Sequence, residues 1–119
     1  MINNKENSII SLNVRVFQAK SFKEKLFGLI FKRLKNDEIF LIKDCNGVHT
    51  FWMFRRIDII FLDQNNKVIS LFKDFKTFRF TPFIKNAVCV IEAESGFISK
   101  HDIYVDVILN LQILRKNIL

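Results

Sequence analysis

The stretch from His49 to Asp63 carries the side chains best suited to acid–base chemistry, within one apolar run. It reads "HTFWMFRRIDIIFLD" and combines a histidine, two arginines and two aspartates with the only tryptophan. General acid–base catalysis needs an imidazole and a carboxylate within hydrogen-bond reach of each other. His49 and Asp58 could supply that pair, with Asp63 as a further carboxylate. A small acid–base or hydrolase-like enzyme is therefore one interpretation of this stretch.

A structural role explains the same residues more simply. At the start of a strand, Asp58 can accept hydrogen bonds from backbone N–H groups and pair with Arg55 or Arg56. A direct contact with His49 is not expected, because the two residues are separated by two strand positions in the hairpin described below. We therefore assign no catalytic residue and predict a binding rim. Its candidate residues are His49, Arg55, Arg56, Asp58 and Asp63.

The two cysteines do not suggest redox or metal chemistry. Cys45 and Cys89 lie far apart and outside any C-x-x-C spacing, so neither a disulfide framework nor a zinc site is indicated. Cys45 lies four residues before His49, but the Asn-Gly turn between them points the two side chains in different directions. We expect no metal, no cofactor and a reducing, cytoplasmic location. No export signal or membrane-spanning run is evident.

The periodicity of apolar residues predicts the elements that would position these side chains. Residues that alternate between apolar and polar, or short apolar runs, predict strands, and apolar residues at helical spacing predict a helix. Strands are expected at 9–18, 38–44, 48–54, 57–63, 68–78, 87–93 and 103–114. Ser21 and Glu24 form a capping box at the start of a helix at about 21–34, and one helical turn is expected at 97–101.

These elements indicate an α+β fold. We expect a largely antiparallel, strongly curved or barrel-like sheet of about seven strands, with the helix at about 21–34 packed on it. One domain should cover residues 1–119, with a disordered tail at 1–8 and a frayed end at 112–119. A core dominated by aromatic side chains is expected from the fourteen phenylalanines in the 119-residue chain.

Two tight turns would position the residues of the predicted binding rim. The Asn46-Gly47 pair can supply the positive backbone angles of a hairpin between 38–44 and 48–54. A second hairpin centred on Arg55 and Arg56 would set Met53 opposite Asp58, Phe51 opposite Ile60 and His49 opposite Leu62. Trp52 would lie on the opposite face from Met53, and a lone tryptophan among apolar neighbours belongs to the core in most proteins.

Several short motifs in this chain resemble those of the prokaryotic family known as domain of unknown function 192. The resemblance runs from about residue 14 to residue 108. It rests on Gly28-Leu29, Phe51-Trp52-Met53, Ile57-Asp58, Phe61-Leu62-Asp63, and Ile91-Glu92 with Gly96. It implies a compact β-rich fold with a helix, and it gives Gly28, Phe51, Trp52, Met53, Glu92 and Gly96 a structural role. The resemblance implies no catalytic role, because the family has no established activity.

The net charge of +7 is concentrated in the first third of the chain. Residues 1–35 hold eight basic and two acidic side chains, and the rest of the chain holds eleven and ten. Lysines on the polar side of the predicted helix could face an anionic membrane. Arginines and lysines alternate with phenylalanines around 72–80, a pattern that could bind nucleic acid. The simpler interpretation is that the rings are buried and the cations face water.

The sequence therefore favours a single-domain, monomeric, non-enzymatic binding or accessory module. A protein or a small molecule is the expected ligand. The alternatives are an enzyme that uses Asp58 and His49, and a basic surface that docks on nucleic acid or anionic membrane.

Overall fold

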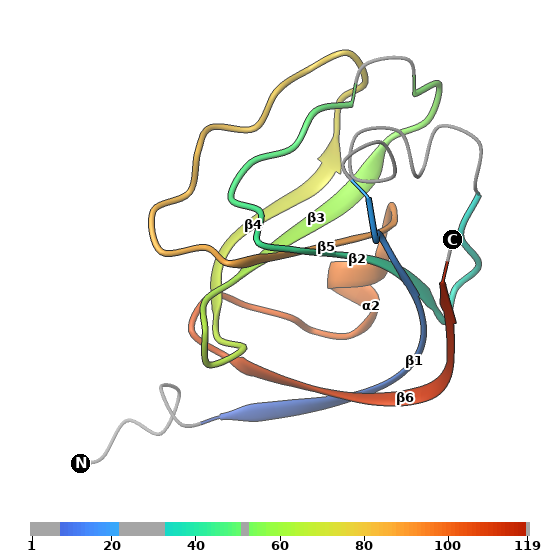
Figure 1. The fold of residues 1–119 in the computed structure, drawn as a ribbon, viewed down its shortest axis with the longest axis vertical. Coiled ribbons are helices and arrows are strands. Elements are labelled where there is room, and N and C mark those ends of the chain that lie inside the picture. Colours follow the sequence, from blue (N-terminus) through green and yellow to red (C-terminus); the bar gives the residue numbers. More distant parts are fainter. Residues whose placement is uncertain (1–7, 22–32, 51–52, 119) are drawn as a thin grey trace.

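The computed structural model describes residues 8–21, 33–50 and 53–118 of the chain (Figure 1). The strands in these ranges are β1 (Ile9–Gln18), β2 (Glu38–Lys43), β3 (Ile57–Leu62), β4 (Val68–Phe75), β5 (Cys89–Glu94) and β6 (Ile108–Ile118). A short helix, α2 (Phe97–Lys100), follows β5 and confirms the predicted helical turn. The helix predicted at about 21–34 lies mostly outside the described residues. No helix in the described ranges is long and apolar enough to cross a membrane.

The described strands form one mixed sheet in the order β4-β3-β5-β2-β1-β6. β2, β3, β4 and β5 pair antiparallel, but β1 runs parallel to both of its neighbours, β2 and β6. The mostly β architecture with a short helix agrees with the α+β prediction, whereas a largely antiparallel sheet was the wrong expectation. Parallel neighbours need a long connection. The chain between β1 and β2 is long enough for such a connection. Alternation of apolar residues within a strand does not show whether the neighbouring strand runs parallel or antiparallel.

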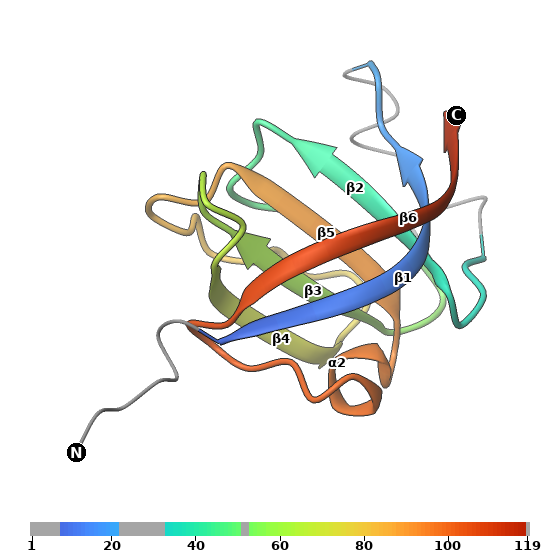
Figure 2. The same ribbon diagram turned by 90° about the horizontal axis from the view of Figure 1, so that it is seen from below.

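The sheet is bent but open, so the barrel-like prediction is also wrong. Figure 2 shows β1 and β6 crossing in front of β3 and β4. In the described part of the chain, the edge strands β4 and β6 meet only near one isolated bridge, between Lys67 and Ile108. A barrel requires a hydrogen-bonded ladder that continues around the whole circumference. One bridge brings the edges together at one end and leaves them apart elsewhere.

The seventh predicted strand, at 48–54, is not formed by its described residues. Residues 48–50, 53 and 54 lie in a loop whose one sheet-like contact is a bridge between His49 and Phe80. The two predicted hairpins are therefore wrong: β2 pairs with β1 and β5, and β3 pairs with β4 and β5. The described part of this apolar run pairs with a remote loop instead of its neighbours in the sequence.

Two further predicted boundaries change. The reversal after β2 uses a positive φ of 54° at Asp44 rather than at Asn46-Gly47. The predicted strand at 103–114 begins only at Ile108. Positive φ values at Asp102 and Asp106, 53° and 81°, turn the backbone before that point. A positive φ bends the backbone out of the extended conformation at these two residues.

Both faces of the central strands are buried. The first core cluster includes Val14, Leu41, Ile60, Ile91 and Leu109. The second lies on the opposite face of the central strands and includes Phe40, Met53, Ile59, Phe61 and Val90. All six residues of β3 are buried. Burying one such large apolar side chain contributes roughly 1.5–3 kcal/mol. β3 is therefore the centre of the fold, and its one polar side chain, that of Asp58, occupies a costly position.

Gly96, just before α2, provides a test of the backbone geometry. Its φ is 99°, and a Cβ added there would meet no atom within 4 Å. We expect Gly96→Ala to lower the free energy of unfolding by roughly 1–2 kcal/mol, because a Cβ is strained in this conformation. Urea denaturation measures the loss. Gly47→Ala is the control, since Gly47 does not have a positive φ and the nearby Phe83 ring is exposed and able to turn. Equal losses of unfolding free energy in the two variants would contradict a special role for the backbone conformation of Gly96.

Candidate functional site

The side chain of Asp58 joins three separate segments of the chain. It lies near the start of β3 and is 1% exposed. Its Oδ1 accepts a hydrogen bond from the backbone N–H of Asp74 at 2.8 Å, and its Oδ2 accepts from Gly96 at 3.2 Å and Ile98 at 2.8 Å. Such bonds to a carboxylate are stronger than those between neutral groups. Asp58 thus fixes the end of β4 and the start of α2 onto β3.

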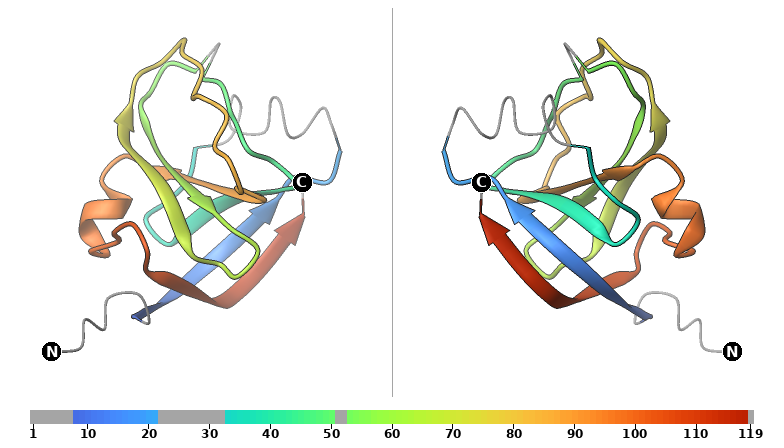
Figure 3. Two further views of the ribbon diagram at one scale, coloured as in Figure 1. Left: turned by 90° about the vertical axis from the view of Figure 1, so that its left-hand side faces the viewer. Right: turned by 90° about the vertical axis from the view of Figure 1, so that its right-hand side faces the viewer.

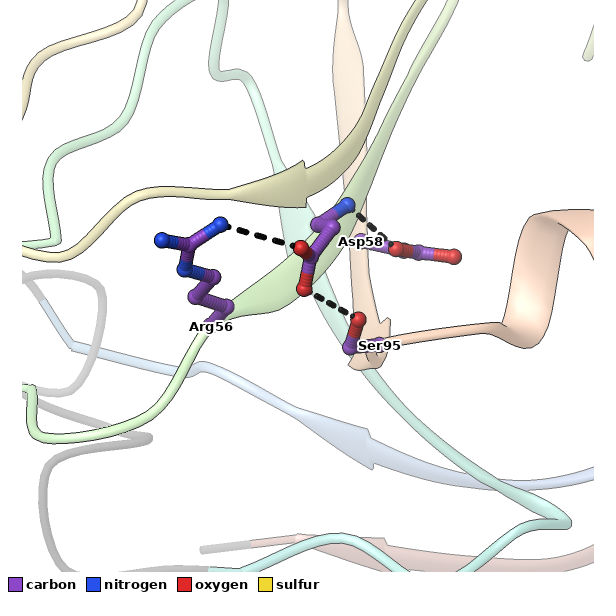
Figure 4. A network of polar contacts seen from close by, with 4 residues as sticks. Arg56, Asp58 and Ser95 are labelled. Carbon is purple, nitrogen blue, oxygen red and sulfur yellow. Dashed lines mark hydrogen bonds and ion pairs between the residues drawn. The ribbon is translucent and has the colours of Figure 1, made fainter.

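Asp74 extends this network to the surface (Figure 4). Its backbone is in the left-handed region, with φ 50°. Its carboxylate accepts a hydrogen bond from the Ser95 hydroxyl at 2.6 Å and another from Arg56 Nη1 at 3.1 Å. The Ser95 hydrogen bond and the nearby Arg56 hold the pKa of Asp74 below its ordinary value, although partial desolvation opposes this. Arg56 therefore reaches Asp58 indirectly, through Asp74, rather than by pairing with it.

A second polar group lies on the opposite face of the sheet. Glu92 of β5 is level with Phe40 and Ile59, both members of the second core cluster. Burial raises the pKa of its carboxyl to about 8, and the positive charge of Arg55 limits the increase. The Nε of Arg55 lies 3.7 Å from Oε1 of Glu94, two residues further along the strand. Glu92 therefore holds its proton at neutral pH within a largely apolar face.

His49 and Asp63 lie away from Asp58. The described contacts of Asp58 do not include His49, which lies in the loop after β2 and is bridged to Phe80. Asp63 follows the other end of β3, where its Oδ1 accepts hydrogen bonds from the N–H groups of Asn65 and Lys67 at 2.8 and 3.0 Å. The structure does not bring the three side chains of the enzyme hypothesis together at one point.

Both cysteines are free thiols. Burial raises the pKa of Cys89 to about 11, so this side chain is a neutral thiol at physiological pH. The Cys45 thiol donates a hydrogen bond to the Gly47 carbonyl at 3.1 Å. Since the thiolate is the reactive form, Cys89 is poorly suited to nucleophilic chemistry.

Hydrogen bonds link the described parts of the loops after β2 and β4 at several points. We call these parts the paired loops: residues 44–50 and 53–56 after β2, and residues 76–88 after β4. The buried hydroxyl of Thr50 donates to the Lys76 carbonyl at 2.7 Å and accepts from the Arg79 N–H at 3.0 Å. The Thr81 hydroxyl accepts from the Val48 N–H at 2.9 Å. Figure 3 shows both loops at one end of the molecule, away from the start of β1.

The paired loops expose several phenylalanines despite this order. Phe54 and Phe83 are 88% and 86% exposed, and Phe80 is 70% exposed. Phe78 is less exposed and meets Phe54 edge to face, with the ring centroids 6.0 Å apart. A hollow of about 360 Å³ lies beside His49, bordered by Phe80 and Phe83. We call Phe54, Phe78, Phe80 and Phe83 the phenylalanine surface.

Sequence reasoning missed the residues that organise both regions. Thr50 and Asp74 carry no recognisable motif, because their partners are 26 and 16 positions away in the sequence. Phe78 and Phe80 were expected to point inward, and both are exposed. The sequence does contain one signal for the paired loops, which was overlooked. Residues 45–57 and 75–91 contain no aspartate or glutamate.

Comparison with known proteins identifies the family. The profile of DUF192, described as "Uncharacterized ACR", matches residues 2–111. The chain belongs to the DUF192 family. The UPF0127 protein PH1112 of Pyrococcus horikoshii is 31% identical over 75 residues, which cover 60% of this chain and 64% of that protein. The chain thus matches a little less than two thirds of the length of this curated relative. The function of the DUF192 family is unknown.

Solved structures share the DUF192 fold. A protein of unknown function from Novosphingobium aromaticivorans matches with a TM-score of 0.68 at 18% identity, over 76% of this chain and 69% of that one. A protein from Sinorhizobium meliloti matches with a TM-score of 0.65 at 12% identity, over 76% of each chain. At these identities the likeness concerns the fold alone.

The motifs on which the DUF192 resemblance rested can now be placed. Asp58 of the Ile-Asp pair bonds to the backbone of Gly96, so two motifs distant in sequence form one contact. Glu92 lies in the middle of β5, and Met53 is buried in the second core cluster. Gly28, Phe51 and Trp52 lie outside the described residues.

The Asp58 network predicts a large loss of stability on substitution. We expect Asp58→Asn and Asp58→Ala each to lower the free energy of unfolding by roughly 3 kcal/mol, because three N–H groups lose a carboxylate acceptor. Urea denaturation at neutral pH measures this. The control is Asp37→Asn, which removes the half-exposed ion pair with Arg15 and should cost under about 1 kcal/mol. An Asp58→Ala protein as stable as the control would restore a chemical role for Asp58.

The raised pKa of Glu92 predicts a pH dependence of stability. Between pH 4.5 and about 8 the folded protein keeps a proton that the unfolded chain releases, so the free energy of unfolding falls as pH rises through this range. Each pKa unit corresponds to about 1.4 kcal/mol. Glu92→Gln should remove this slope and be more stable than wild type at pH 8 but not at pH 5. Denaturant titrations across this range test it, and parallel curves for the two proteins would contradict it.

Proposed function

We propose that the protein is a non-enzymatic binding module whose contact surface is formed by the paired loops. The single observation that carries this proposal is the phenylalanine surface, with Phe54 and Phe83 almost fully exposed on loops that are otherwise well bonded. Single exposed apolar residues are ordinary, but clustered ones mark interaction sites. Burial of each ring would contribute roughly 1.5–3 kcal/mol of stability, which the protein lacks while both rings remain in water.

The predicted rim fits this surface in part. His49 borders the hollow next to Phe80 and Phe83, and Arg55 and Arg56 end the first of the two loops. Asp58 and Asp63 supply hydrogen-bond acceptors to the backbone, which favours a scaffold role for both. We also propose a cytoplasmic location, which the two free thiols support.

Binding of an apolar, anionic dye tests the proposed surface. Anilinonaphthalene sulfonate should fluoresce in the presence of the folded wild-type protein, and the double variant Phe54→Ser/Phe83→Ser should lose more than half of that signal. Because both rings are exposed, the free energy of unfolding of the double variant should lie within about 0.5 kcal/mol of the wild-type value. Val105→Ser is the control, because Val105 is 48% exposed and lies in the turn before β6. A full signal from the double variant, or an equal loss from Val105→Ser, would refute the proposal.

A further inference from the structure

The charge around the phenylalanine surface is mainly positive. The paired loops carry five lysines and arginines, and Asp44, the first residue of the first loop, is their one carboxylate. Arg55 and Arg56 are paired with Glu94 and Asp74. The other three, Lys76, Arg79 and Lys85, are exposed and form no ion pair within the described part of the chain. A partner of this surface should therefore be both apolar and anionic.

The exposure of the rings distinguishes between two anionic partners. A nucleobase that stacks on an aromatic ring covers one face of the ring and leaves the rest of it uncovered. Phe54 and Phe83 are 88% and 86% exposed, so nearly all of each side chain is in water, although Phe54 meets Phe78 edge to face. Such rings are best accommodated by a medium that surrounds them. The acyl boundary of a bilayer is such a medium, and it lies directly below a layer of phosphates.

The position of a cation relative to the rings agrees with this layering. Arg79 lies between Phe78 and Phe80 in the sequence, and its Nη1 donates to the carbonyl of Phe78 at 3.1 Å. The guanidinium is thus held near the level of the backbone, while Phe80 is 70% exposed. Phenylalanine has no polar group, so its ring can enter the acyl boundary without leaving a hydrogen bond unmade.

The paired loops are also ordered before any partner arrives. Thr50 N–H donates to the Arg79 carbonyl at 2.8 Å, Phe78 N–H to the Thr50 carbonyl at 2.9 Å, and Thr81 N–H to the Val48 carbonyl at 2.9 Å. Because these bonds fix the backbone on which the rings stand, docking would cost little conformational entropy.

We propose that the paired loops dock on the surface of an anionic lipid bilayer. Phe54 and Phe83 enter the acyl boundary, and Lys76, Arg79 and Lys85 face the phosphates of the lipid headgroups. This inference rests on the proposed binding function and names the partner of the same surface.

Co-sedimentation of the full chain with vesicles at low salt tests the proposal. The protein should bind vesicles of phosphatidylcholine mixed with phosphatidylglycerol and should bind pure phosphatidylcholine much more weakly. Phe54→Ser and Phe83→Ser should each weaken binding by about tenfold. Lys76→Gln, Arg79→Gln and Lys85→Gln should each weaken it by about fivefold, and these losses should shrink at high salt.

Two controls make the test specific. Lys100→Gln removes an exposed lysine on α2, and Val105→Ser removes an exposed apolar side chain before β6, so both should bind like wild type. The proposal is overturned if the controls lose as much as the loop variants, if both vesicle types bind equally, or if oligothymidylate displaces the protein from the vesicles. Failure here together with a positive dye result would leave the binding module intact and exclude lipid as its partner.

Discussion

The fold depends on a single buried carboxylate. Asp58 lies within a strand whose residues are all buried, and it is accommodated there because three backbone N–H groups from two other segments converge on it. Burying a carboxylate without such donors is strongly unfavourable. The dependence is therefore mutual: β3 accepts the charge only when the end of β4 and the start of α2 are in place, and these segments are held by the charge. Arg56 and Ser95 complete the arrangement from the surface, through Asp74.

Glu92 shows how far the surroundings decide what a carboxyl group does. It belongs to β5, the strand that pairs with β3, but its side chain is on the other face, level with Phe40 and Ile59. Among the described residues, no backbone N–H donates to its carboxyl group. Burial raises the pKa of Glu92 to about 8, and the positive charge of Arg55 only limits the increase. The same sheet thus holds one carboxyl group that binds backbone donors and another that is kept as an acid by its apolar neighbours.

The sequence was informative where the signal is local. Alternation located β1, and apolar runs bounded by turn residues located β2 and β3, to within a residue or two; Gly96 after "ES" marked the turn before α2. It could not supply the partners of each strand, because the same alternation suits parallel and antiparallel neighbours. The paired loops were missed for a related reason: Thr50 and Thr81 act through partners in another segment, and no spacing within either loop reveals them. The resemblance to DUF192 located Asp58 and Gly96, and the structure supplies the contact that links them.

The parallel pairing of β1 with β6 has a consequence for how the chain reaches this state. Ile9 is in register with Ile108, so the two strands that share the longest ladder are separated by nearly all of the sequence. During synthesis β1 must wait, with one edge uncovered, until β6 has left the ribosome. Contacts of such high sequence separation slow folding and lengthen the life of aggregation-prone intermediates. Completion of the sheet is therefore a late step in folding, and until then the edge of β1 that β6 will cover stays open to pairing with other chains.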